Sequence, residues 1–364
     1  MACANNVAAF GPQERALLMD ENLNLKDQET QVGFPFYLLE MKDPVILYLR
    51  SESSYERMLQ GTGTNQLGRI NSRGNTLKEI NPLTGALSIS KGPLIVEVEE
   101  PDSYDRLFGP SAHKLLDAAI IALTAKSRGS EVSIPLPFYA EALGKPQTKA
   151  SIDKLRKSVK ADLATIASTK LSWSEKRGKS VREFSMVPIC TSAAIKGGCI
   201  TICFSSEFAS YLASAYIVQY PLQLLKLDER CPSAYYIGKK LFLHFGMDSN
   251  QAKGTASIIS VRSLLSWCED TIPSYDDVMA HSRHVDRLII KPLENALDTL
   301  AGAGVIAKWA YCNAKKAPLS ESQIALASYA VFIGLYISFE PQGYPSERIT
   351  KIAQLEKAKP EKGL

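Results

Sequence analysis

The stretch KASIDKLRKSVKADLATIASTKLSWSEKRGKSVR, residues 149–182, is the most informative part of the sequence. Its apolar residues recur at helical spacing as far as Ser168, and strand-forming residues then flank a polar hairpin. Residues 145–182 hold eleven basic residues against three acidic ones, a net charge of +8 in a chain whose total is +4. Positive charge is therefore concentrated on one helix and the hairpin after it, which predicts a polyanionic partner.

The composition is that of a soluble globular protein. The chain has 364 residues, of which 45% are hydrophobic, and this favours two domains over one. No stretch approaches the roughly 20 apolar residues that span a bilayer, and the N-terminus does not resemble a signal peptide. Seven scattered cysteines without a CxxC pair are typical of buried thiols in a reducing compartment. We therefore expect a cytoplasmic protein without membrane association.

From residue 109 onward the sequence predicts regular elements. A helix at 110–126 precedes a strand at 131–135, a short helix at 138–143, a turn at 144–147 and a long helix at 148–168. Strands at 171–173 and 181–188 then flank the polar hairpin at 174–179. This order of helix, strand, helix, turn, helix and hairpin is that of a winged helix-turn-helix unit.

The same order recurs after Cys231, as an internal duplication would produce it. The expected elements are a helix at 233–245, a strand at 257–259, a helix at 261–268, a long helix at 278–301 and strands at 305–311 and 331–339. The sequence therefore predicts an α+β fold of tandem winged-helix domains with an N-terminal extension. We expect an arm at residues 1–85 that is partly irregular, a first winged-helix domain at 86–220, a second at 221–345 and a C-terminal tail at 346–364.

The first long helix separates its apolar and basic residues. Apolar residues from Ile152 to Ile166 form one stripe, and the basic residues fall on another sector that contains Asp153 as its one acid. This sector and the hairpin give the first predicted DNA-binding set: Lys149, Lys154, Arg156, Lys157, Lys160, Lys176, Arg177, Lys179 and Arg182. A merely solvated face is the alternative for the helix alone, but the basic hairpin favours phosphate contacts.

The second long helix has an outer face whose charge changes sign. Its N-terminal half holds the second predicted DNA-binding set: His281, Arg283, His284, Arg287 and Lys291. Arginine in the N-terminal half of a recognition helix can bind guanine O6 and N7. The acidic residues Glu294 and Asp298 occupy the C-terminal half.

Two features of this second helix admit other interpretations. Arg283 and Arg287 can form surface ion pairs with Asp286 or Glu294 in place of DNA contacts. Pro292 removes a helical hydrogen bond, so we expect it to kink the helix or to end its first half near Lys291.

The sequence shows no recognisable active site. It lacks the GxxxxGKS/T, GxSxG and HExxH motifs, and also the paired histidines of nicking initiators. Its four histidines complete no familiar ligand set with cysteines or carboxylates. We therefore predict a protein that is not an enzyme and that has no metal site and no cofactor.

Four segments, by their order and spacing, resemble the Rep family of winged-helix plasmid replication initiators: SAHKLLDAAIIALT at 111–124, FYAEALG at 138–144, SAYYIGKKLFLHF at 233–245 and VDRLIIKPLENALDTL at 285–300. The resemblance implies that two units straddle a DNA duplex and that each places a helix near a major groove. It also implies a target of directly repeated origin sequences, called iterons, with a monomer active in initiation and a homodimer that represses its own promoter.

We thus expect a plasmid replication initiator that binds iteron repeats in double-stranded origin DNA and recruits the host initiator and helicase machinery. Phosphate neutralisation would supply affinity, base contacts would set the register, and the DNA would bend or melt nearby. A winged-helix transcriptional regulator that binds a palindrome in its own promoter is the first alternative. A diverged primase or nicking enzyme and a protein-interaction scaffold are the others.

Overall fold

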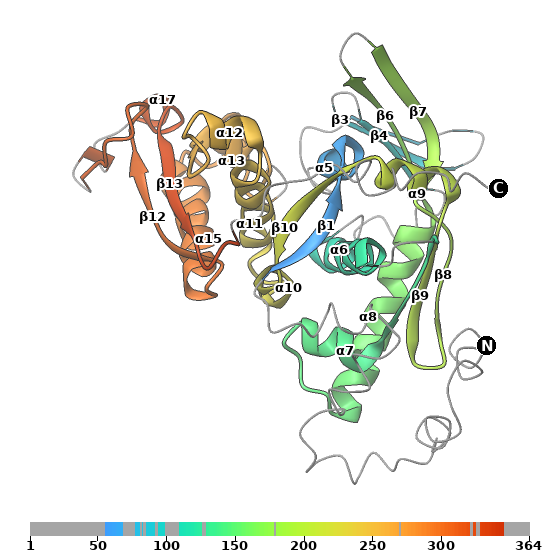
Figure 1. Cartoon of the computed structure of the whole chain (residues 1–364). Coiled ribbons are helices and arrows are strands. Elements are labelled where there is room, and N and C mark those ends of the chain that lie inside the picture. Colours follow the sequence, from blue (N-terminus) through green and yellow to red (C-terminus); the bar gives the residue numbers. More distant parts are fainter. Residues whose placement is uncertain are drawn as a thin grey trace, which may run out of the picture.

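The computed structural model is an α+β protein in which helices alternate with small antiparallel sheets (Figure 1). It describes residues 55–67, 77–80, 82, 85–91, 94–98, 109–125, 129–177, 180–268, 271–320, 323–324 and 328–345. None of the helices in these ranges combines the length and the apolar composition that crossing a bilayer requires.

The N-terminal module, residues 110–204, is built around one buried helix. Its elements are α6 (Pro110–Ala125), β5 (Glu131–Pro135), α7 (Leu136–Ala142), α8 (Lys149–Ala167), β8 (Cys190–Lys196) and β9 (Cys199–Phe204). α6 lies at the centre because residues around almost its whole circumference are buried. α8 packs against α6 and β8, and the three strands form a sheet of order β5-β9-β8.

A second sheet is inserted between α8 and β8. β6 (Thr169–Arg177) and β7 (Ser180–Pro188) form the hairpin that the sequence predicts, but β6 pairs with β4 (Leu94–Val98) and not with β5. With β2 (Leu77–Ile80) and β3 (Leu87–Lys91), the sheet order is β2-β3-β4-β6-β7. The hairpin expected as the first wing therefore belongs to another sheet. The reason is that Leu171 lies opposite Val96, and both are fully buried there.

Part of the expected arm belongs to the fold. β1 (Tyr55–Gln60) pairs with β10 (Tyr216–Pro221), and α5 (Thr62–Leu67) follows it. Met58 and Leu59 are buried, so residues 55–67 of the segment expected as a partly irregular arm pack into the core. These elements are short and lie in polar sequence, so their apolar periodicity was too brief to predict them. Residues 1–54 and the expected tail at 346–364 lie outside the described residues.

The C-terminal module, residues 232–341, repeats the order of the first. Its elements are α11 (Pro232–Phe245), α12 (Asp248–Ala252), β11 (Ile258–Ser260), α13 (Val261–Leu265), α14 (Tyr275–His281), η4 (Asp286–Ile290), α15 (Lys291–Gly302), β12 (Ile306–Cys312), α17 (Tyr329–Phe332) and β13 (Tyr336–Pro341). Its sheet has the order β11-β13-β12. In both modules, therefore, the third strand lies between the first and the second.

The long helix expected at residues 278–301 is divided in two. α14 ends at His281, and a π turn, η4, leads directly into α15. Between them Arg283 has a φ of +58°, a left-handed conformation that a right-handed helix cannot contain. The first half ends near Lys291, as expected from Pro292: η4 ends at Ile290, Lys291 N–H donates to Asp286 O across the wide π turn, and the chain continues directly as α15.

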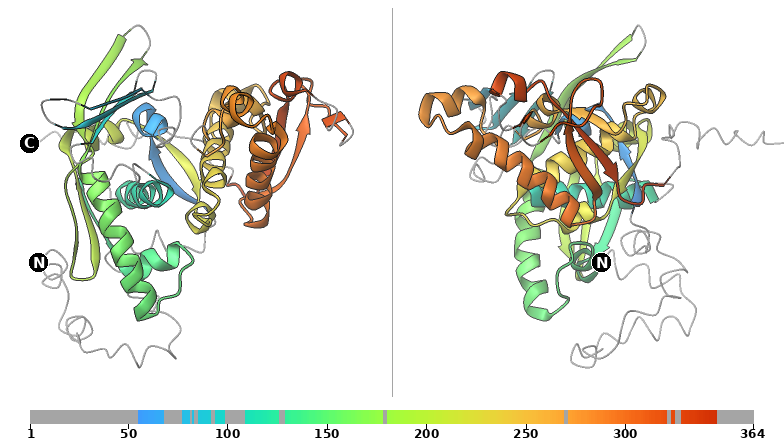
Figure 2. Two further views of the ribbon diagram at one scale, coloured as in Figure 1. Left: turned by 180° about the vertical axis from the view of Figure 1, so that it is seen from behind. Right: turned by 90° about the vertical axis from the view of Figure 1, so that its left-hand side faces the viewer.

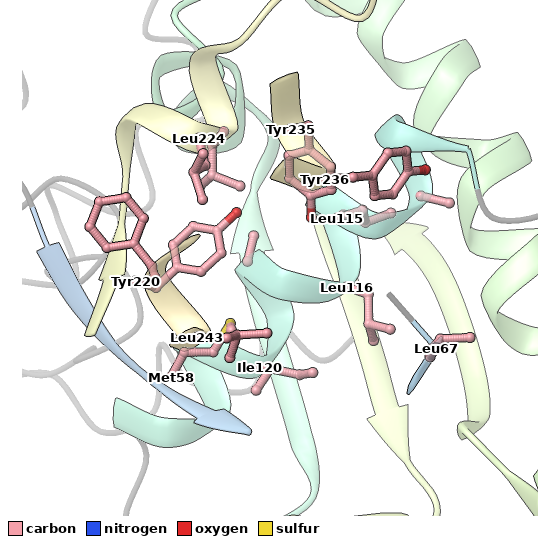
Figure 3. Close-up of a cluster of buried hydrophobic side chains, with 14 of the residues drawn as sticks. Met58, Leu67, Leu115, Leu116, Ile120, Tyr220, Leu224, Tyr235, Tyr236 and Leu243 are labelled. Carbon is pink, nitrogen blue, oxygen red and sulfur yellow. The ribbon is translucent and has the colours of Figure 1, made fainter. Parts of the chain in front are cut away.

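The two modules share one hydrophobic core. α9 (Ser206–Ala213), β10 and α10 (Gln223–Lys226) connect them, and α11 packs against β10, α10 and α15. Figure 3 shows side chains of α6 among those of β1, β10 and α11: Met58, Leu115, Leu116, Ile120, Tyr220, Tyr235, Tyr236 and Leu243. The central helix of the first module is thus in contact with the first helix of the second.

Gly238 of α11 marks a very close approach in this core. A Cβ there would overlap Leu224 Cδ2 and would lie 2.8 Å from Leu300 Cδ2. We expect Gly238→Ala to lower the free energy of unfolding by about 1–3 kcal/mol through overpacking. Gly302→Ala is the control, since a Cβ at that position would have no atom within 4 Å. Urea unfolding measures both variants, and equal midpoints would contradict this close packing.

Lys114 of α6 makes stability depend on pH. It is 2% exposed and donates to Leu227 O at 2.5 Å. Burial lowers its pKa from 10.5 to about 8, and the nearby Glu229 partly offsets this. Between these pH values the unfolded chain keeps a proton that the folded protein has released, so the free energy of unfolding rises with pH by at most about 1.4 kcal/mol per unit. We expect the unfolding free energy of the wild type, minus that of Lys114→Met, to increase with pH across this window. A difference independent of pH would contradict the assignment.

Candidate nucleic-acid interface

α8 presents the basic face that the sequence predicts. Thr148 caps its first turn by accepting a hydrogen bond from Ser151 N–H. Leu155, Val159 and Leu163 are buried on the side that packs against the module. The basic residues are all exposed: Lys149, Lys154, Arg156, Lys157 and Lys160.

This face keeps its positive charge toward solvent. Arg156 Nη1 lies 3.6 Å from Asp153 Oδ1, an exposed pair of small energetic weight. Within the described ranges, the four lysines of the face have no ion-pair partner. Unpaired exposed cations of this kind are what phosphate binding uses, because condensed counterions leave the nucleic acid when lysines approach it.

The turn before α8 fixes the direction in which the helix leaves α7. Gly144 ends α7 with a φ of +66°, a conformation that favours glycine. Gly144 N–H donates to Glu141 O, and Lys145 N–H donates to Ala140 O. Lys145 Nζ also lies 3.7 Å from Glu229 Oε1, in the segment that leads into the second module.

The basic hairpin lies away from the start of α8. β6 and β7 project at the top of the molecule in Figures 1 and 2, whereas α7, which leads into α8, lies at the bottom. Arg182 is exposed on β7. Lys176 and Arg177 are in β6, but their side chains and the whole of Lys179 lie outside what the structure describes. The structure therefore does not place this hairpin beside the N-terminal half of α8.

A different hairpin, which the sequence analysis missed, packs along α8. β8 and β9 are joined through Gly197 and Gly198, whose φ angles are +54° and +76°. Two-residue hairpin turns require this left-handed conformation and therefore favour Gly-Gly. β8 contacts α8 along its length (Figure 1). The Lys196-Gly197-Gly198 sequence between two apolar runs was the available signal.

The second predicted set surrounds the break between α14 and η4. The side chains of His281, Arg283, His284, Arg287 and Lys291 are exposed. His281 Nδ1 lies 2.8 Å from Asp277 O, so this ring is held against its own helix. The break separates His281, which ends α14, from Arg287, which lies in η4.

The alternative ion pairs of the two arginines do not form. Asp286 pairs with Lys291 at 3.2 Å, and neither Arg283 nor Arg287 has an ion-pair partner in the described part of the chain. Glu294 accepts a hydrogen bond from the Tyr311 hydroxyl at 3.2 Å, and burial raises the pKa of Glu294. Neither guanidinium group therefore forms an ion pair with a described residue.

The remaining acid of α15 is also engaged by the sheet. Trp309 Nε1 donates to Asp298 Oδ1 at 2.9 Å. Glu294 and Asp298, the acids in the C-terminal half of the helix, thus both bond to side chains of β12. Before them in the chain, His281, Arg283, His284 and Arg287 are exposed, and Lys291 pairs with Asp286.

Among the described residues, no group of three or more His, Cys, Asp or Glu side chains is placed to hold a metal ion. His281 ends α14 and His284 follows the left-handed Arg283, so the two histidines no longer share one helical turn.

The left-handed Arg283 supports a prediction about stability. A side chain with a Cβ is strained at this φ by roughly 1–2 kcal/mol, whereas glycine is not. We expect Arg283→Gly to be more stable than Arg283→Ala by about 1 kcal/mol, although both remove the guanidinium group. Thermal and urea unfolding of the two variants measure this difference. An alanine variant as stable as the glycine variant would show that the turn is not held left-handed.

Comparison with known proteins finds similarity among solved structures. No protein-family model matches the chain, and no curated protein matches it. Among solved structures, the chain is similar to the crystal structure of domains 2 and 3 of RctB, with a TM-score of 0.33 and 10% sequence identity over 63% of this chain and 87% of that chain. A TM-score of this size assigns neither a fold nor a function to this chain.

Proposed function

We propose that this protein is a replication initiator that binds double-stranded DNA through two winged-helix units and carries out no catalytic step of its own. Helix, strand, helix, helix and hairpin follow one another in both modules, and the strand order agrees. A winged helix-turn-helix has these elements in the same order, which supports the proposal. The observation that carries the proposal is the exposed basic face of α8, whose lysines lack ion partners in the described ranges.

In the N-terminal module, α8 is proposed to bind phosphates. Its lysines are flexible point charges, which suit backbone contacts better than base recognition. The start of the helix adds the positive end of the helix dipole, and the Gly144 turn directs that start away from α7. The β8–β9 hairpin beside it takes the place of the wing that the sequence analysis assigned to β6–β7.

In the C-terminal module, the start of η4 is proposed to read bases. Arg287 lies in the first turn of this helix and is exposed. A planar guanidinium group at that position can form two hydrogen bonds to guanine in the major groove. Because Glu294 and Asp298 bond to β12, they do not compete for it.

Two unlike modules in one chain are suited to an asymmetric site. A symmetric dimer reads a palindrome, whereas a single chain with two different reading helices reads a sequence with direction. Repeats of such a site would be direct repeats. This argument and the four segments that resemble plasmid initiators support iterons as the target, with recruitment of host replication proteins and a repressing homodimer as parts of the same proposal.

The test is selection of bound duplexes from a random 30-base-pair library. We expect a non-palindromic site with two motifs about one helical turn apart. Arg287→Ala should relax the preference at one base pair by about 1–3 kcal/mol. A selected palindrome would favour the transcriptional regulator, and no enrichment at all would refute sequence-specific binding.

The lysines of α8 should contribute to DNA affinity without contributing to sequence preference. With the selected duplex, we expect Lys149→Gln, Lys157→Gln and Lys160→Gln together to weaken binding equally for matched and mismatched sites. The slope of log Kobs against log salt should become less steep by about 0.9 for each phosphate that the variant no longer neutralises. Lys308→Gln is the control, because Lys308 pairs with Glu340 at 2.9 Å. An unchanged slope in the triple variant would contradict the role of α8.

A further inference from the structure

We propose that Asp117, Tyr235 and Lys239 are positioning residues that fix the orientation of one DNA-binding module relative to the other, and so set the spacing of the two half-sites. This inference rests on the proposed function and specifies how the two reading helices are coordinated. It concerns a group of side chains that lies outside both predicted DNA-binding sets.

The group bridges the two modules. Asp117 lies in α6, the central helix of the N-terminal module, while Tyr235 and Lys239 lie in α11 of the C-terminal module. Lys239 Nζ is 2.6 Å from Asp117 Oδ1, and the Tyr235 hydroxyl donates to Asp117 Oδ2 at 2.5 Å. Both oxygens of one carboxylate are thus bonded by the other module.

All three side chains are buried within the shared core, with exposed fractions of 2% for Asp117, 0% for Tyr235 and 4% for Lys239. Burial and the neighbouring Asp117 raise the pKa of Tyr235 well above its ordinary value. The hydroxyl therefore stays a hydrogen-bond donor at any pH at which the protein would bind DNA.

Such a group fixes the relative orientation of α6 and α11 more than it stabilises the fold. Burying an ion pair costs desolvation, and apolar side chains of the same volume can stabilise a core equally well. Hydrogen bonds, however, hold only over a narrow range of distance and angle. Any sliding of α6 along α11 would leave a buried charge without its partner, which is strongly unfavourable.

Each of the two bridged helices is bound directly to a helix that carries basic residues. Ser111 Oγ of α6 donates to Asp162 Oδ1 of α8 at 2.8 Å. On the other side, α11 packs against α15, with Gly238 beside Leu300. α8, α6, α11 and α15 are therefore in continuous contact, and a rotation between α6 and α11 would turn α8 relative to η4 by the same angle.

The spacing of DNA half-sites depends on that angle. Each base pair inserted between two half-sites rotates one of them about the helix axis by about one tenth of a turn. A rigid pair of modules should accept one spacing, and a loosened pair should accept several. The bridging group is the feature that makes the pair rigid.

The experiment compares the wild type with Asp117→Leu combined with Tyr235→Phe and Lys239→Met, in the full chain. Ser266→Ala is the matched control, since it removes a hydrogen bond to Ser263 O within one module, away from α6, α8, α11 and α15. Binding is measured to the selected duplex and to the same duplex with one, two or five base pairs inserted. In parallel, spin labels carried by unnatural amino acids at the exposed Ala150 and Asn295 report the distance between modules in the free protein.

For the wild type and the Ser266→Ala control, we expect each insertion of one or two base pairs to weaken binding at least about tenfold, the cost of one mismatched base pair. In the triple variant this penalty should fall to roughly threefold or less and the label distances should broaden, with the unfolding midpoint little changed. The inference is overturned if the triple variant shows the same spacing penalty as the wild type and an equally narrow distribution of label distances.

Two further outcomes are decided by the label distances alone. If the wild type binds no duplex, the proposed function fails, while a broadened distance distribution in the variant still supports the positioning role and an unchanged one refutes it. If the triple variant does not fold, Tyr235→Phe alone replaces it, because it removes one hydrogen bond and no charge. A distance distribution as narrow as that of the wild type in Tyr235→Phe then counts against the inference.

Discussion

The buried carboxylate of Asp117 binds the two halves of this molecule to each other within the core that they share. It sits on a helix that is buried around most of its circumference, where an unpaired charge would be strongly unfavourable. Its partners, Tyr235 and Lys239, come from the other module. The N-terminal module can therefore bury its central helix in this form only when α11 is docked against it. The two modules depend on each other for a satisfied core.

Around this shared core, apolar, basic and acidic side chains lie on different faces of the elements. Small antiparallel sheets support the helices, and apolar faces point inward along α8 and α15. The basic residues of α8 point outward, while the acids of α15 bond to Trp309 and Tyr311 on β12. Positive charge is thus left exposed at the starts of two helices. The architecture explains how a chain of almost neutral total charge can present two cationic surfaces.

Sequence patterns predicted the helices well and the pairing of strands poorly. α6, α8 and α11 follow from apolar periodicity, and the end of α7 follows from Gly144. No local rule marks an arginine such as Arg283 as left-handed, so the helix break was missed. The partner of the β6–β7 hairpin depends on Leu171 meeting Val96, a contact between distant segments that periodicity cannot reveal. The exposed basic residues were predictable because charge shows directly in the sequence, whereas the hairpin beside α8 was not recognised.

The insertion of one sheet within another has a consequence for how the chain folds. Val96 pairs with Leu171, and Val132 pairs with Ile202, so the two sheets interleave along the polypeptide. Helices can form locally as the chain emerges, but these strand pairs must wait for distant segments and close large loops. The sheet beside α8 is complete only after β9 has been synthesised. Because these strand pairs join distant segments, the N-terminal module should assemble late and slowly. Until then, the basic helix α8 lacks the sheet that packs against it.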